Sequence, residues 1–429
     1  MAKKNLFYLF VGLCSILWIL FYFKNLLLVP FHPDEATQIY MSQDVELIIN
    51  HTSDLFFHEI PQNQSTQLYR LLDAPLTKYF IGIFRNIFNQ EPLNFDWDWT
   101  RTWNENFHAI PSDGLLYSSR LSAAIFFPFS ILLFALIMKD IFGDDRFFII
   151  LSILLFSLNS LLLLHTRRAM AESGMIFFLL LSLFTFSKIP KKWFFLASIP
   201  IALAINTKQT LFFLIPLAII IIIFYFKKHW KTLGLQLGLF FIILVGIFYV
   251  LNPIMWKEPI KVALQMMKAR KELTQNQTIA IGSVTPEFLI NKHSEKITAF
   301  IAQIFILDPA PQDINNYQNE INPSISRYFQ NPLHKGFLRN LLGGTIYFIL
   351  FIFGFYQSFY FLDRKHKLIF LSGFILLSLE ILFLFKIPFQ RYYLPAIPFT
   401  IIFAMIGLKQ SILNLKNSHL FDSYKKLKN

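Results

Sequence analysis

Two adjacent carboxylates, Asp34 and Glu35, stand directly after a long hydrophobic segment. Carboxylates beside a bilayer are costly to desolvate, so this pair is either ordinary solvated loop or a site prepared for a proton, a cation or a charged ligand. His32 precedes the pair, but a metal site built from these three residues is disfavoured because it needs fixed geometry and further supporting contacts. The pair therefore predicts proton transfer or ligand binding at a membrane boundary.

Basic side chains stand at the ends of other hydrophobic segments, where they could bind phosphate. For each of them a structural role is also open, such as snorkelling toward the interface or an ion pair with an acid. For example, Arg120 could bind phosphate or pair with Asp34. The candidate phosphate-binding residues are Lys78, Arg120, Arg167, Arg168, Lys208 and Arg391.

The elements that must position these residues are membrane helices. Hydrophobic residues make up 55% of the 429 residues and charged residues 15%, which leaves too little polar surface for a water-soluble chain. At a spanning length of about 20 residues the sequence predicts about ten helices. They cover residues 6–29, 115–138, 147–164, 171–188, 190–207, 209–226, 232–251, 339–361, 367–385 and 392–409.

The loops between these segments predict the topology. Short basic loops alternate with two long ones, 30–114 and 252–338, so the positive-inside rule places both termini in the cytoplasm. Stretches 76–88 and 259–270 are expected to be interfacial helices. Much of the net charge of +13 follows from this topology and from contact with anionic lipid, so no nucleic-acid partner is expected.

This topology predicts four parts of the chain: a catalytic membrane module 1–251 that includes loop 30–114, a second external loop 252–338, C-terminal helices 339–409 and a basic cytoplasmic tail 410–429. The carboxylate pair and the candidate cations all fall on the external face. A row of cations near two carboxylates suits an anionic lipid-linked ligand that arrives from the membrane.

Several short motifs on this face resemble one enzyme family. Pro75-Leu76-Thr77-Lys78 has the form P-L-x-K, Ser119 begins an S-R-L-x-A motif, and Arg167 begins an R-x-x-x-x-[DE]-S motif. Arg391 begins an R-Y-x-x-P motif. In this order, after the acidic pair, they resemble the polyprenyl-phosphate-sugar-dependent glycosyltransferases, in particular the protein O-mannosyltransferases and the lipid A aminoarabinose transferases.

The resemblance implies roles for these residues. The fold would be a GT-C bundle, Asp34 would be the general base for an acceptor hydroxyl, and Glu35 would orient Asp34 or a nearby cation. The basic residues would hold the donor phosphate, although one of Arg167 and Arg168 is then only a surface cation. The family usually has H-P-P-L-x-K where this chain has Asp73-Ala74-Pro75, so any role of that histidine is in doubt.

Further polar and aromatic residues are candidates for the substrate pocket. Glu172 takes the acidic position of its motif, while Glu380 lies inside a predicted helix and could face the same cavity or pair with a polar group of the bundle. The tyrosines after Arg391 could stack on a sugar or belong to the interfacial aromatic belt. The candidates are Asp73, Glu172, Tyr392, Tyr393 and Glu380.

The predicted function is transfer of a hexose or pentose, with inversion, from a polyprenyl-phosphate donor to an acceptor hydroxyl on a protein, lipid or glycan of the cell envelope. The expected partners are that donor, an extracytoplasmic acceptor and the lipid bilayer of the cell membrane. No nucleotide loop is present, and the resemblance implies no obligatory metal or other cofactor. The alternatives are a transporter or flippase of lipid-linked sugars and a binding subunit without the chemistry.

Overall fold

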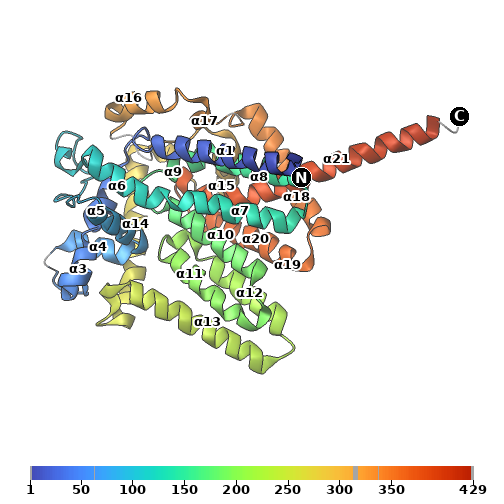
Figure 1. Cartoon of the computed structure of the whole chain (residues 1–429). Helices are drawn as coiled ribbons and strands as arrows, with labels where there is room; N and C mark the ends of the chain where they lie inside the picture. The colour runs from blue at the N-terminus through green and yellow to red at the C-terminus, as the bar shows by residue number, and fades with distance from the viewer. Residues whose placement is uncertain (1, 62, 313–316, 337, 427–429) are drawn as a thin grey trace.

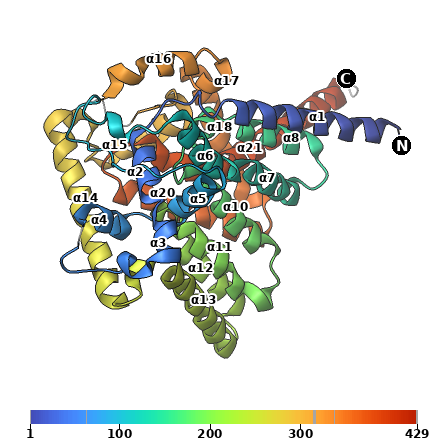
Figure 2. The same cartoon turned by 60° about the vertical axis from the view of Figure 1, so that its left-hand side comes forward.

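The chain is all-helical, as expected, and the residues that its structure describes contain no strand. The structure is a computed structural model that describes residues 2–61, 63–312, 317–336 and 338–426. The start of α1 and the end of α21 lie at one end of the molecule, whereas α3, α4 and α5 lie at the other (Figures 1 and 2). The side of the membrane that each end faces stays a prediction.

Six helical stretches in the described residues are long and apolar enough to cross a membrane, so the chain is a multi-pass membrane protein. They are the pair α6 (Asp113–Ala124) and α7 (Phe126–Phe142), α12 (Leu214–Phe226) with the preceding turn η4 (Gln209–Leu211), α13 (Trp230–Leu251), α18 (Leu341–Phe361), α19 (Arg364–His366) with η9 (Lys367–Leu371) and α20 (Ser372–Leu384), and η10 (Gln390–Ala396) with α21 (Ile397–Lys426).

The other four predicted spans are also helical, but three of them are short or broken. They form α1 (Ala2–Lys24), α8 (Arg146–Ser157) with α9 (Ser160–His165), α10 (Glu172–Lys188), and η3 (Lys191–Ala197) with α11 (Ser198–Ile205). Between α8 and α9 the side chain of Asn159 accepts hydrogen bonds from the backbone N–H groups of Leu161 and Leu162 at 3.1 and 3.3 Å. This cap starts a new helix where one continuous span was expected, so the count of ten remains a prediction.

The tightest helix crossing joins α18 and α21, which cross through glycines. A methyl group at Gly354 would lie 1.7 Å from the carbonyl oxygen of Phe403, and one at Gly407 would lie 2.2 Å from that of Leu350. The two backbones therefore touch directly, as small residues allow between membrane helices.

The two long loops are also mostly helical. The first contains α2 (Pro33–Met41), α3 (Asp44–Asn50), η1 (Thr52–Leu55), α4 (Gln64–Leu72), α5 (Leu76–Ile87) and η2 (Phe107–Ala109). The second contains η5 (Pro253–Met255), α14 (Pro259–Val284), η6 (Pro286–Phe288), α15 (His293–Ile301), η7 (Ala302–Ile306), α16 (Gln318–Tyr328) and α17 (Pro332–Lys335). The helices expected at 76–88 and 259–270 are thus present as α5 and α14, although α14 continues well past residue 270.

The predicted parts of the chain pack together closely. The C-terminal helix α21 contacts α8, and α14 of the second loop contacts α4 of the first. The tail predicted to start at residue 410 continues α21 as helix to Lys426, and its last residues lie outside the described residues. The division into four parts stays a prediction.

Candidate active site

Asp34 lies in the first turn of α2, which His32 and Glu35 cap. The Nδ1 atom of His32 accepts a hydrogen bond from the Asp34 backbone N–H at 3.1 Å, and a carboxylate oxygen of Glu35 accepts one from the His32 backbone N–H at 3.1 Å. Pro33 favours this helix start because its ring fixes φ and it has no N–H to satisfy. The cap holds Asp34 at the helix entrance with 29% of its side chain exposed.

Glu35 points the other way and is completely buried against Arg120. The Arg120 guanidinium donates to both Glu35 carboxylate oxygens at 2.8 and 2.7 Å, and the backbone N–H of Ala169 donates to Glu35 at 3.0 Å. Arg120 also donates to the carbonyl oxygens of Leu26 and Val29 at 2.7 and 2.8 Å. Burial alone would raise the pKa of Glu35, but the paired Arg120 holds that pKa below its ordinary value.

This pair joins the end of α1, the start of α2, α6 and the turn before α10. Both side chains are fully buried, so the arrangement suits a structural support beneath Asp34 better than contact with a substrate.

Around Asp34 the structure gathers two of the expected cations and one acid. Arg391 donates to the Asp34 carboxylate, and Lys208 pairs with Glu172. The side chains of Arg391 and Lys208 are 15% and 16% exposed, whereas that of Glu172 is buried. Four separate segments of the chain thus meet here, and the residues that retain solvent access are Asp34, Arg391 and Lys208.

Lys78 takes part in a buried ion cluster that the sequence did not reveal. Its ammonium lies 2.7 Å from Oδ2 of Asp44, and Oδ1 of the same carboxylate accepts from the Arg70 guanidinium at 2.8 Å. Burial would raise the pKa of Asp44, but the Lys78 and Arg70 cations lower it. No local spacing points to Asp44, because 34 residues separate it from Lys78 and only the packing of α3 on α5 joins them.

Asp73 lies at the C-terminal end of α4, half-buried between acids and bases. Burial raises the pKa of Asp73 above its ordinary value, and the nearby Asp34 carboxylate raises it further. The Arg270 and Lys78 cations offset only part of this rise. Arg270 comes from α14 and donates to the backbone carbonyl of Leu72. The second long loop thereby brings a cation to the site, and Arg270 carries no motif that could have identified it.

Arg167 and Arg168 are both buried, in different surroundings. One Arg167 nitrogen lies 3.0 Å from Nε2 of His334, and its guanidinium lies 5.1 and 4.8 Å from the ring centroids of Phe21 and Tyr22. Arg168 donates to backbone carbonyls of residues 30 and 311. Arg167 therefore ties α17 to α1, and Arg168 ties the segment after α1 to the second long loop. Neither is the surface cation that was expected for one of them, because both are buried, and their assignment to phosphate remains a prediction.

The remaining pocket candidates lie around η10 and α20. Tyr392 lies beside Lys208 and Arg391, with its ring 5.9 Å from the ammonium and 5.8 Å from the guanidinium, whereas Tyr393 is buried in the main core. Glu380 accepts from the backbone N–H of Phe213 at 3.0 Å and so caps the start of α12. Glu380 thus pairs with a polar group of the bundle, and its place in the substrate pocket stays a prediction.

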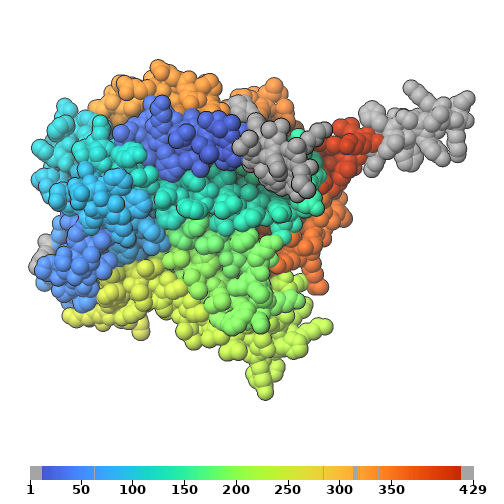
Figure 3. All heavy atoms as spheres, viewed as in Figure 1, coloured from blue at the N-terminus to red at the C-terminus, as the bar shows by residue number. Residues whose placement is uncertain are grey.

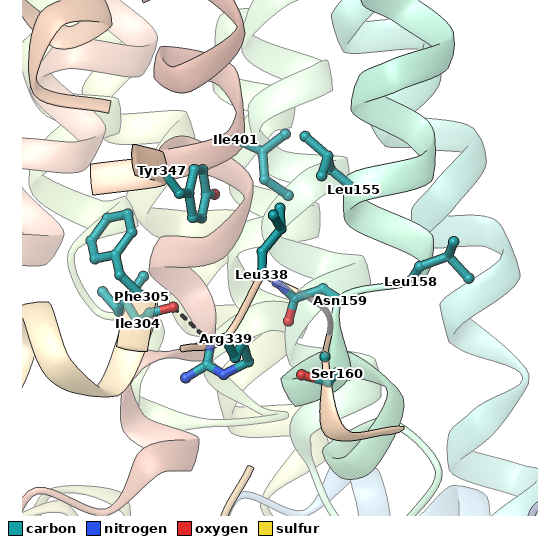
Figure 4. A pocket seen from close by; sticks show the side chains of 11 residues that line it. Leu155, Leu158, Asn159, Ser160, Ile304, Phe305, Leu338, Arg339, Tyr347 and Ile401 are labelled. Atoms are coloured by element: carbon teal, nitrogen blue, oxygen red, sulfur yellow. Dashed lines mark hydrogen bonds between the residues drawn. The ribbon is translucent and has the colours of Figure 1, made fainter. Parts of the chain in front are cut away.

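A small cavity of about 40 Å³ lies elsewhere, between the break of α8 and α9 and the start of α18 (Figure 4). Figure 4 shows Arg339 beside it, where the guanidinium donates to the Ile304 carbonyl oxygen at 2.7 Å. None of the expected site residues lines this cavity.

Comparison with known proteins gives a family match and a likeness to solved structures. Residues 65–256 match the model of the family described as dolichyl-phosphate-mannose-protein mannosyltransferase. This range contains seven of the candidate residues, Asp73, Lys78, Arg120, Arg167, Arg168, Glu172 and Lys208, whereas Asp34, Glu35 and Arg391 lie outside it.

Among solved structures, one similar chain is the Archaeoglobus fulgidus oligosaccharyltransferase, crystallised with zinc and sulfate. The identity is 12% and the TM-score 0.45, over 93% of this chain and 48% of the other, so this chain spans about half the length of that protein. No curated protein matches the chain. Residues 65–256 thus carry a domain of the dolichyl-phosphate-mannose-protein mannosyltransferase family, which confirms over that segment the resemblance expected from the sequence.

Proposed function

We propose that the chain is a membrane glycosyltransferase that moves a sugar from a polyprenyl-phosphate donor to an extracytoplasmic hydroxyl acceptor. The observation that carries this proposal is the grouping of one accessible carboxylate, Asp34, with two accessible cations, Arg391 and Lys208. The family of the matched segment is named for a lipid-phosphate donor, which supports the same reading. The acceptor is a hydroxyl of a protein, lipid or glycan.

In the proposed reaction the acceptor hydroxyl gives its proton to Asp34 while its oxygen attacks the anomeric carbon. The bond from that carbon to the phosphate oxygen breaks, and polyprenyl phosphate leaves with the bonding electrons. Attack from the side opposite the phosphate inverts the anomeric centre. Arg391 and Lys208 stabilise the charge that develops on the phosphate, where Arg391 can offer two parallel hydrogen bonds.

The contacts divide the candidate residues into two groups. Asp34, Lys208 and Arg391 are the residues proposed to touch substrate, because they retain access to solvent. Glu172 holds Lys208, and the buried pair Glu35–Arg120 and the cluster around Lys78 fix the helices that carry them. Lys78, Arg120, Arg167 and Arg168 then act on the donor through position and long-range charge.

The cell membrane is the proposed location, with both termini in the cytoplasm and Asp34 on the external side. Cytoplasmic termini and an external site let a lipid-linked donor reach Asp34 from the outer leaflet. No metal or other cofactor is assigned a role in this proposal.

The test uses purified protein in detergent with a sugar-labelled polyprenyl phosphate and a cell-envelope extract as acceptor. Label that moves from the lipid to the acceptor fraction supports the proposal. A transporter needs two separated compartments, so it would leave the label on the lipid in detergent but would move the donor between leaflets of a proteoliposome. That pair of results would refute the proposal in favour of a flippase.

A further inference from the structure

A second recess lies where α3 faces the end of α5, away from Asp34. It has a volume of about 480 Å³, which falls within the range of about 300–1,000 Å³ of small-ligand sites. The recess and the buried ion cluster of Lys78 both lie between α3 and α5. Lys78 and Arg85 are seven residues, or about 10 Å, apart along α5. Figure 3 shows this part of the chain, in blue, at the surface opposite the termini.

Arg85 forms the floor of the recess and is fully engaged. Its side chain is 2% exposed and donates to the Ser42 hydroxyl at 3.2 Å, to the Gln90 carbonyl oxygen at 2.8 Å and to a Glu46 carboxylate oxygen at 2.5 Å. Each of its three nitrogens thus has a protein partner. The guanidinium therefore fixes Glu46 and is not open to an incoming phosphate.

The second carboxylate oxygen of Glu46 is buried and has no hydrogen-bond partner among the described residues. A buried acceptor without a partner is unfavourable, so a ligand hydroxyl that donates to it would gain a strong contact. The first oxygen of the same carboxylate is held by Arg85. The orientation of the free oxygen is therefore set before any ligand arrives.

Side-chain amides line the rest of the recess. Gln43 comes from the turn before α3, Asn86 from the last turn of α5 and Asn89 from the turn that follows. Asn89 has a φ of 52°, in the left-handed region that asparagine tolerates, and its N–H donates to the Asn86 carbonyl oxygen at 3.1 Å. This turn keeps two amides at one edge of the recess.

The lining chemistry selects the ligand class. Two carboxylates, Glu46 and Glu91, and one guanidinium line the recess, which gives the lining a formal charge of −1 and disfavours anions. Amides donate and accept, and carboxylates accept, which together match hydroxyl groups that do both. Leu47 and Pro92 add apolar surface for the C–H faces of a ring. We propose that this recess binds a neutral carbohydrate through its hydroxyl groups.

This is a proposal about binding, and it does not depend on the role of Asp34. It is tested on the full chain in lipid nanodiscs, because maltoside detergents carry the same hydroxyl chemistry. The probes are methyl α-mannoside, methyl α-glucoside and maltotriose. Their binding is detected by saturation-transfer NMR and quantified by titration. A glycosyl diacylglycerol placed in the nanodisc separates a lipid-borne sugar from a free one.

The decisive variant is Gln43→Ala combined with Asn86→Ala, with Asn94→Ala as an exposed control outside the recess. Loss of two hydrogen bonds should weaken binding about tenfold or more, while the control leaves binding unchanged. The proposal is supported if a free or lipid-borne sugar binds the wild type and the control but binds the double variant more weakly. Which of the two sugars binds shows whether the ligand is free or lipid-borne. No saturable binding by the wild type, or equal binding by the double variant, would overturn the proposal.

Calcium ion provides a further arm of the test, because carboxylates and amide oxygens also bind hard cations. The proposal would likewise be overturned if the wild type binds calcium but none of the sugars, and the double variant loses the calcium. The recess would then be a cation site.

Discussion

Replacing Glu35 by glutamine tests whether this residue is structural support or part of the chemistry. Its carboxylate accepts from two of the three Arg120 guanidinium nitrogens, from the His32 N–H and from the Ala169 N–H. Glutamine keeps one acceptor oxygen but turns an NH₂ group toward donors and leaves the buried Arg120 without a counter-charge. Breaking a buried ion pair from one side costs about 3–5 kcal/mol, so we expect Glu35→Gln to lower the free energy of unfolding by about 3 kcal/mol.

The assay is equilibrium unfolding of the purified protein by SDS in mixed micelles, with Glu105→Gln as a surface control. The control should change the free energy of unfolding by less than about 0.5 kcal/mol, as exposed substitutions do. A Glu35→Gln variant as stable as the wild type but inactive would refute the structural role and return Glu35 to the catalytic group.

Three further predictions follow from the packing and the charges. Lys78→Met should lower the free energy of unfolding by about 2 kcal/mol, measured as above, because Asp44 loses one of its two cations; an unchanged stability would contradict the ion cluster. Gly354→Val should lower the free energy of unfolding by about 3 kcal/mol or more, whereas Gly246→Val, at a site with open space around it, should lower it far less. Equal shifts of the thermal unfolding temperature for the two variants would rule out the close crossing of α18 and α21. Burial lowers the pKa of His334 to about 4, so the unfolded chain binds this proton at higher pH than the folded chain, and stability should fall as pH drops from about 6.5 to about 4. A His334→Gln variant should lose that part of the pH dependence, and a profile identical to the wild type would show that His334 is not its source.

The sequence was a good guide to the fold because hydrophobic length and loop charge leave few arrangements for membrane helices. It failed in detail where side chains reshape a helix, as at Asn159, whose cap divides one expected span into α8 and α9. The glycine crossing of Gly354 with α21 also has no local pattern, since it depends on which two helices meet.

For the site, the sequence singled out Asp34, Lys208 and Arg391, and the structure brings these three residues together. The side of the membrane that they face stays a prediction. The sequence could not tell an accessible cation from a buried one, because burial depends on partners that are distant in the chain. Asp44 beside Lys78 and His334 beside Arg167 are such partners. Both cations are thus engaged inside the protein, and their contact with a phosphate remains a prediction.

The central claim is that Asp34 accepts the proton of the acceptor hydroxyl, and Asp34→Asn in the detergent transfer assay tests it most directly. Asparagine nearly preserves the shape of the side chain but cannot take the proton, so transfer should fall by about 10²-fold or more. Binding of labelled polyprenyl-phosphate sugar and the thermal stability should be retained, and Asp113→Asn, an exposed acid of the same face, should transfer normally. Full transfer by Asp34→Asn would contradict the account.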